Sequence, residues 1–262
     1  MRLVRASLLK LVHRPATMRT FLLLVGLLAL IYVALGLSAR AAASASSQST
    51  IAGMLTFPDA LRQLASMLLI FGGFAGAAHA GMMAGSEWTW STFRAALTRG
   101  ESRVHYLIGL FLAIGLVALI AWVVLCLLGV GLIVVAAGLG GLPASDPLAA
   151  STGGQLVLVV ASGGWAVLME VAIGFAAAFI ARSQVAGVAT IAGLFFVERF
   201  AELVLPADAL RFAPITAATN LVADVGKTGL EAGLGLAFVV TSLYLVGAIT
   251  LGALAARRAQ VT

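Results

Sequence analysis

Charged residues are scarce in this sequence. Asp, Glu, Lys and Arg make up 10% of the 262 residues, whereas they form about a quarter of an ordinary soluble domain. Hydrophobic residues make up 62% and the mean hydropathy is +1.11, so the composition excludes a soluble domain and an intrinsically disordered chain. The apolar runs are continuous and do not alternate with polar residues, which excludes a transmembrane β-barrel. The sequence therefore predicts an all-α integral membrane protein.

Residues that form disulfides or metal sites are also few. Cys126 is the single cysteine, so an intrachain disulfide is excluded, and we expect this residue in the core. The histidines His13, His79 and His105 lie in different segments, and the chain has neither a His-Glu-x-x-His nor a Cys-x-x-Cys pattern. We therefore expect no catalytic residue, no metal site and no cofactor bound by this chain.

One short motif matches the end of a nucleotide-binding P-loop. Gly226-Lys227-Thr228 has the last three residues of that pattern, but Leu221 stands where the pattern requires its first glycine. The backbone N–H groups of a glycine loop cradle the phosphates, and this sequence does not supply such a loop. We expect no ATP binding at this motif.

Six stretches are long and apolar enough to cross a bilayer, which takes about 20 residues. They predict spans at residues 20–39, 62–86, 104–137, 154–181, 183–205 and 232–256, which form a single transmembrane domain over residues 1–262. The first stretch could instead be a signal peptide, because small residues follow it. It is longer than the usual apolar segment of about 7–15 residues, however, so we interpret it as a span.

The basic residues predict the orientation, because cytoplasmic segments of membrane proteins carry an excess of Lys and Arg. The two ends of the chain hold Arg2, Arg5, Lys10, Arg14, Arg19, Arg257 and Arg258. Both ends are therefore expected in the cytoplasm, which requires an even number of spans. The charge-free run Val104–Ser145 is long enough for a hairpin of two helices, but the even count favours one helix followed by the Gly-rich exit 138–143.

The segment before the first span has the pattern of an interfacial helix. Apolar residues fall on one face and Arg2, Arg5, Lys10 and Arg14 lie around the rest, until Pro15 ends the pattern. A charged topology signal without a helix of its own is the alternative. Between the last two predicted spans, residues 198–231 contain Pro206 and Pro214 among apolar residues, so we expect short outer helices that dip toward the membrane.

Two of the titratable residues inside predicted spans, Glu170 and His79, are candidates for a function. Glu170 lies well within an apolar stretch, where a charge is unfavourable by about 2.5–3.5 kcal/mol, so it should face the interior of the bundle with a partner or be protonated. His79 lies among four glycines, and a polar side chain there is expected to face other helices. Both residues are candidates for a translocation path, and a structural hydrogen bond between helices is the alternative.

The segment 86–103 is the most informative part of the predicted cytoplasmic side. It begins with Glu87 near a helix N-terminus, continues as a short amphipathic helix with Trp88 and Trp90 at interface depth, and reaches Gly100 before the next span. It contains no nucleophile beside a base. Such a helix on the cytoplasmic face is a candidate docking element.

The order of these elements resembles the type-2 ABC exporter permeases. The resemblance rests on the basic N-terminal helix, the six spans, the pattern Glu-x-x-x-x-Thr-hydrophobic-Arg-x-x-Leu-Thr-Arg-Gly-x-Ser-Arg from Glu87 to Arg103, Arg182-Ser183 before the fifth span and Ala213-Pro214 before the sixth. Ser91-Thr92 supplies the usual pair of small residues, whereas Arg99-Gly100 replaces the commoner proline turn and Gly109 stands where a lysine often follows. The resemblance covers nearly the whole chain.

This resemblance implies a permease subunit that is not an enzyme by itself. Its N-terminal helix would be an elbow, and its coupling helix would hold Glu87, Trp88, Trp90, Thr92, Phe93, Arg94, Arg99 and Arg103. The implied partners are two copies of an ABC ATPase that hold ATP and Mg²⁺, a second permease of the same or a paralogous sequence, and the lipid of a bacterial plasma membrane, but no nucleic acid.

Two other classes of function remain open from the sequence. A proton-coupled secondary carrier would use Glu170 or His79, and inverted repeats with broken helices would favour it, but no such symmetry is visible. A membrane protein of assembly or signalling is the third class. It differs from a permease in that no ATPase would copurify with it.

Overall fold

The computed structural model describes residues 7–11, 13–42, 45–143, 145–147, 149–223 and 232–258, and every regular element in these ranges is helical. Six segments within these ranges are long and apolar enough to cross a membrane, which confirms the predicted number. They are Pro15–Ala41 (α2), Asp59–Thr89, Arg103–Leu139 (α7), Ala150–Ala181 (α8), Gln184–Ala201 (α9) and Ala232–Arg258 (α12). The chain is a multi-pass helical membrane protein.

The third predicted span is one helix and not a hairpin. α7 runs for 37 residues before Gly140 and Gly141 end it, and Gly141 has a φ of +66°. The first span begins at Pro15, five residues earlier than predicted, because proline is favourable in the first turn of a helix. The fifth helix ends at Ala201 and not at the predicted residue 205.

The second span has three parts that the hydropathy pattern does not separate. It consists of Asp59–Leu68 (α4), the π-helix Leu69–Gly73 (η1) and Phe74–Thr89 (α5). The helix Ala45–Leu55 (α3) precedes it and the short helix Thr92–Thr98 (α6) follows it. Between α9 and α12 lie the short helices Ala207–Leu210 (α10) and Pro214–Ala223 (α11), as expected of this segment. The motif Gly226-Lys227-Thr228 lies outside the described residues.

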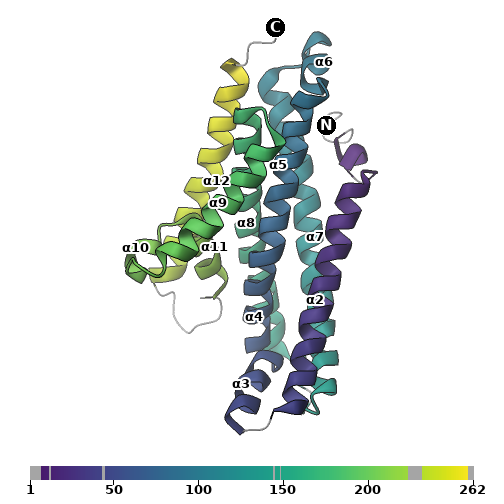
Figure 1. The fold of residues 1–262 in the computed structure, drawn as a ribbon, viewed down its shortest axis with the longest axis vertical. Helices are drawn as coiled ribbons and strands as arrows, with labels where there is room; N and C mark the ends of the chain where they lie inside the picture. Colours follow the sequence, from purple (N-terminus) through teal and green to yellow (C-terminus); the bar gives the residue numbers. More distant parts are fainter. Residues whose placement is uncertain are drawn as a thin grey trace.

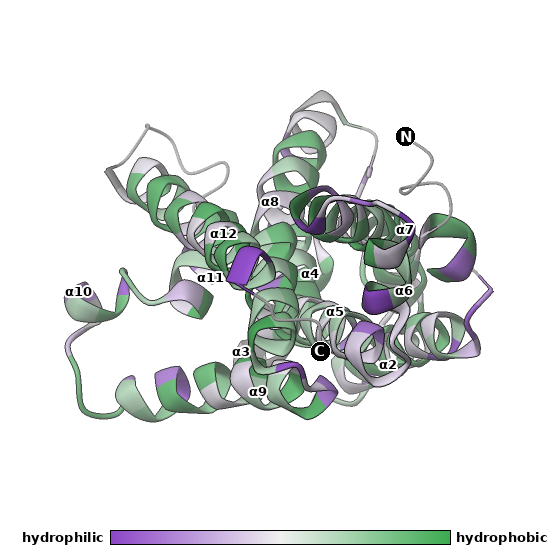
Figure 2. Ribbon diagram, turned by 90° about the horizontal axis from the view of Figure 1, so that it is seen from above, coloured by the Kyte–Doolittle hydropathy of each residue, from purple (hydrophilic) through white to green (hydrophobic). Residues whose placement is uncertain are grey.

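The bundle has two unlike ends (Figure 1). α6, the start of α2 and the end of α12 lie together at one end, whereas α3 and the end of α7 lie at the other. Viewed onto the first end, hydrophilic residues gather at the end of α12 and around α6, and most of the remaining ribbon is hydrophobic (Figure 2). α9 diverges from the bundle in both views. As a result, α10 and α11 lie at the side of the bundle, between its two ends.

The contact between α5, α8 and α9 depends on small residues. A Cβ added at Gly174 of α8 would lie 2.3 Å from the backbone oxygen of Ala77, and one added at Gly187 of α9 would lie 2.6 Å from the Cα of Gly81. In a membrane, helices associate through close packing of this kind, because lipid is as apolar as their side chains. These glycines therefore fix the position of α5 against its two neighbours.

We expect Gly174→Ala to lower the free energy of unfolding by about 1–3 kcal/mol, because the methyl group overpacks a contact between two backbones. Gly193→Ala is the matched control, since a Cβ at Gly193 of α9 meets nothing within 4 Å. The measurement is denaturant unfolding of both variants in detergent. Equal stability of the two variants would contradict the close contact of α8 with α5.

Candidate functional site

A buried carboxylate joins four segments at the end of the bundle that carries α6. Glu87, predicted near a helix N-terminus, instead lies in the last turn of α5 and is 2% exposed. Its Oε1 accepts a hydrogen bond from Lys10 Nζ at 2.5 Å, and its Oε2 accepts one from Thr92 Oγ1 and one from Tyr106 OH, each at 2.5 Å. Lys10 belongs to the helical residues 7–11, Thr92 begins α6 and Tyr106 lies in the first turns of α7. A buried charge of this kind needs a partner and further donors, and Glu87 has both.

The turn between α5 and α6 is fixed by its own backbone. Trp90 N donates to Ser86 O at 3.0 Å, and Ser91 N donates to Trp88 O at 3.1 Å. Ser91 has a φ of +53°, in the left-handed region, and this reverses the chain direction. Thr92 Oγ1 also lies 3.3 Å from the backbone oxygen of Glu87. The first residue of α6 is therefore bonded to the side chain and the backbone of the same glutamate.

Aromatic side chains pack directly against this polar cluster. Phe93 is 1% exposed, and its ring centroid lies 4.8 Å from that of Trp88, 5.5 Å from that of Tyr106 and 5.3 Å from that of Phe179 in α8. Arg182, which follows α8, lies over the Trp88 ring at 4.7 Å. Phe93 thus points into the bundle and anchors α6, and it does not present its ring to a partner at this end.

The basic residues of the predicted elbow lie against the predicted coupling segment. Arg14 Nη1 donates to Met83 Sδ at 2.9 Å and to Ser86 Oγ at 3.2 Å, and its guanidinium lies 4.5 Å from the ring centroid of Trp90. Together with the ion pair of Lys10 and Glu87, this contact makes the two segments one surface. Arg2 and Arg5, the other predicted elbow residues, lie outside the described residues.

Three of the remaining predicted coupling residues face outward, and Arg103 does not. Trp90 is 61% exposed, and Arg94 and Arg99 lie on the exposed side of α6. Arg103 is half-buried, and its Nη1 donates to the backbone oxygen of Arg257 at 2.9 Å, which ties the end of α12 to the start of α7. We call Trp90, Arg94 and Arg99 the outer face of α6. This face is basic and aromatic, so it is better suited to binding a protein partner than to catalysing a reaction.

Glu170 occupies a separate site deeper in the bundle. It is 2% exposed, and its carboxylate lies directly against Gly73, where a Cβ would overlap it. Gly73 ends the π-helix η1, an irregularity that is frequent at functional sites. A small cavity of about 10 Å³, with space for roughly one water molecule, adjoins Glu170 between η1, α9 and α11.

Glu198 is a buried residue whose role the sequence analysis did not find. It is 4% exposed, and its carboxylate accepts hydrogen bonds from Ile215 N at 3.0 Å, Thr216 N at 2.7 Å and Thr216 Oγ1 at 2.9 Å. A side chain of α9 thus caps the first turn of α11, where unpaired backbone N–H groups favour a carboxylate. In the sequence, Pro214 indicates the start of a helix. The residue that caps this helix lies 17 residues before Ile215, and no local pattern identifies it.

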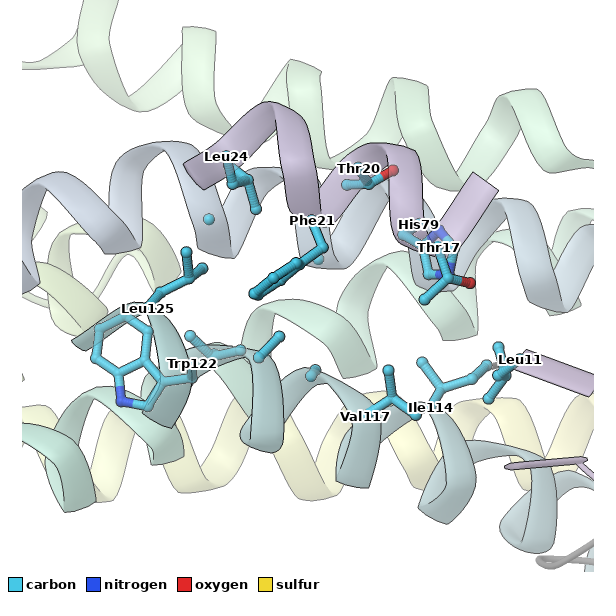
Figure 3. Close-up of a pocket in the computed structure, with 15 residues that line it drawn as sticks. Leu11, Thr17, Thr20, Phe21, Leu24, His79, Ile114, Val117, Trp122 and Leu125 are labelled. Carbon is cyan, nitrogen blue, oxygen red and sulfur yellow. The ribbon is translucent and has the colours of Figure 1, made fainter. Parts of the chain in front are cut away.

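His79 and Glu170 line different cavities, so the structure does not combine them in one site. His79 Nε2 lies 3.2 Å from Thr17 Oγ1 of α2, in a cavity between α2, α5 and α7 (Figure 3). Among the described residues, no group of three or more His, Cys, Asp or Glu side chains is placed to hold a metal ion. Cys126 is buried, as expected of a core residue.

The ion pair of Lys10 and Glu87 should couple strongly in a double-mutant cycle. We expect Lys10→Met and Glu87→Gln each to lower the free energy of unfolding, with an interaction energy of about 1–3 kcal/mol, because Glu87 is buried. The pair of Arg62 and Asp59 is the control. Its side chains are 28% and 63% exposed, so the same cycle there should give less than about 1 kcal/mol. Equal interaction energies would refute the structural role of Glu87.

We compared the chain with models of known protein families and with curated proteins, and neither comparison gave a match. The function is therefore inferred from two features of the molecule. One is the joined surface of the N-terminal segment, α5 and α6. The other is the buried carboxylate of Glu170 beside the π-helix.

Proposed function

We propose that the chain is the transmembrane permease subunit of an ATP-driven exporter of the type-2 ABC class. The proposal rests on two contacts, the ion pair of Lys10 with Glu87 and the stacking of Arg14 on Trp90. These contacts join the N-terminal segment and the start of α6 into one surface. A subunit driven by a separate ATPase needs such a surface at one end of its bundle. Two copies of that ATPase hold the ATP and Mg²⁺, and a second permease completes the path.

The contacts of α6 suggest how a movement at this surface would spread. Phe93 packs on Tyr106 of α7 and on Phe179 of α8, and Thr92 is bonded to Glu87 of α5. A displacement of α6 would therefore move three spans together. α5 would carry the displacement to α9 through the close contact of Gly81 with Gly187.

The proposed orientation places this surface in the cytoplasm of a bacterial cell. The start of α2, α6 and the end of α12 lie at one end of the bundle (Figure 1), and Arg14, Arg94, Arg257 and Arg258 belong to these segments. Cytoplasmic ends of membrane proteins carry such an excess of basic residues. The plasma membrane is the location that this orientation implies.

Reversing the charge of the outer face of α6 should release the ATPase. We expect an ABC ATPase to copurify with the chain at native expression, in about equal copy number. Arg94→Glu should lower its affinity by about 30-fold, which corresponds to the roughly 2 kcal/mol typical of an anchor residue. The measurement is quantitative mass spectrometry of the pull-down.

Two variants serve as controls for this experiment. Arg211→Glu makes the same charge change beside α10, on a different surface, and should leave the ATPase bound. Phe93→Ala opens a cavity among buried aromatic rings. It should therefore lower both the recovery of the ATPase and the thermal stability of the permease, whereas Arg94→Glu should lower the recovery alone. If no ATPase is recovered with the unaltered chain, or if it is recovered equally with Arg94→Glu, the proposal fails.

The proton-coupled carrier is the second candidate, because Glu170 is buried beside a π-helix. Vesicles that contain the purified chain, an imposed pH gradient and an entrapped pH-sensitive dye distinguish the two. Under the exporter proposal the gradient persists as in empty vesicles, and Glu170→Gln changes nothing in the absence of an ATPase. Glu202→Gln, at an exposed position after α9, is the control. Proton entry that Glu170→Gln abolishes and Glu202→Gln preserves would refute the exporter.

A further inference from the structure

An elongated cavity of about 80 Å³ lies between α2, α5 and α7 (Figure 3). Small residues make room for it, because Gly72 and Gly76 on one side face Ala118 and Ala121 of α7 on another. A Cβ added at Gly72 would meet nothing within 4 Å, so this part of the space is open. Most of the wall is apolar and is formed by Leu11, Phe21, Leu24, Val117, Trp122 and Leu125.

The two ends of the cavity differ in polarity. His79 and Thr17 lie at one end and Leu125 and Trp122 at the other (Figure 3). Trp122 is held in place, because its Nε1 donates to the backbone oxygen of Val160 at 3.0 Å. Thr17 is near the start of α2, so the polar end lies toward the end of the bundle that carries α6.

Two polar atoms near this end are buried and have no hydrogen-bond partner among the described residues: Nδ1 of His79, which lines the cavity, and Nη2 of Arg14, which lies beside it. His79 is 8% exposed, and Arg14 Nη1 donates to Met83, which lies one helical turn after His79 in α5. If Thr17 Oγ1 donates to His79 Nε2, then Nδ1 carries the proton and is a donor, as is Arg14 Nη2. Buried donors are rarely left unpaired, so in this tautomer the two atoms indicate an acceptor that completes the site.

We propose that this cavity binds one single-chain amphiphile with an anionic head group. The head group accepts a hydrogen bond from His79, the positive charge of Arg14 nearby favours an anion there, and the alkyl chain extends past Phe21 and Val117 toward Leu125. Between Ile114 and Leu125 the axis of α7 rises by about 16 Å, which gives an alkyl chain a long apolar wall. Arg14 also lies over Trp90 of the outer face of α6, but the inference rests on the cavity and does not depend on the proposed exporter function.

The test uses quenching of Trp122 fluorescence by bromine. The full chain is placed in nanodiscs of phosphatidylcholine and titrated with 9,10-dibromostearic acid, and the signal of Trp122→Phe is subtracted to isolate Trp122. We expect saturable quenching by the acid. We expect at least about tenfold weaker quenching by its methyl ester, because the ester loses a charged acceptor.

Paired variants locate the bound molecule in this cavity. Gly72→Leu fills the open space and should abolish saturation, whereas Gly131→Leu adds the same side chain at an exposed position of α7 that also has nothing within 4 Å and should preserve it. His79→Leu should weaken binding about tenfold, because it removes a donor to a charged group. His105→Leu, at an exposed position of α7, should not.

Three results of these titrations would overturn the inference. They are an absence of saturable Trp122 quenching, equal quenching by the acid and the methyl ester, and equal binding by Gly72→Leu and Gly131→Leu. Nanodiscs that contain dibrominated phosphatidylcholine distinguish a free amphiphile from a bilayer lipid. Strong quenching of Trp122 by that lipid, which added stearic acid does not relieve, would assign the cavity to ordinary lipid chains and would also overturn the inference. Because the ester comparison needs only the unaltered chain and Trp122→Phe, it decides the question even if Gly72→Leu does not fold.

Discussion

The position of α6 depends on the burial of one carboxylate. Removing Glu87 from water is unfavourable by several kcal/mol unless its oxygens are bonded, and its donors come from the N-terminal segment, α6 and α7. The same interaction therefore folds three parts of the chain against α5. Because Lys10 is 77 residues away from Glu87, the N-terminal segment is a component of this end of the bundle and not an independent appendage.

α5 carries a different kind of contact along each of its faces. Toward α8 and α9 it presents glycines whose backbones touch those of its neighbours, so little space is left for independent movement. Toward α2 and α7 it presents Gly76 and His79 to a cavity. One helix thus combines a rigid contact, an internal space and a polar end, and the proposed coupling and binding roles meet on it.

The sequence predicted the elements of this protein better than their side-chain contacts. Charge-free runs of about 20 residues gave the number of spans, because a membrane imposes that length on every helix that crosses it. The π-helix η1 was not predicted, since no hydropathy pattern distinguishes it from an α-helix. Phe93 was expected to face a partner and instead lies inside, and the capping role of Glu198 was missed. Such roles depend on residues far away in the sequence, which periodicity does not reveal.

The shortness of α9 has a consequence for the surrounding lipid. Its 18 residues extend about 27 Å, whereas the 37 residues of α7 extend about 56 Å, and α9 also slopes away from the bundle (Figure 1). Exposed Phe196, Phe200 and Leu203 mark its far end. A span shorter than the hydrocarbon layer makes the bilayer thin beside it. The membrane next to α9 is therefore expected to be compressed, and an amphiphile that crosses there would meet a shorter barrier than elsewhere around the protein.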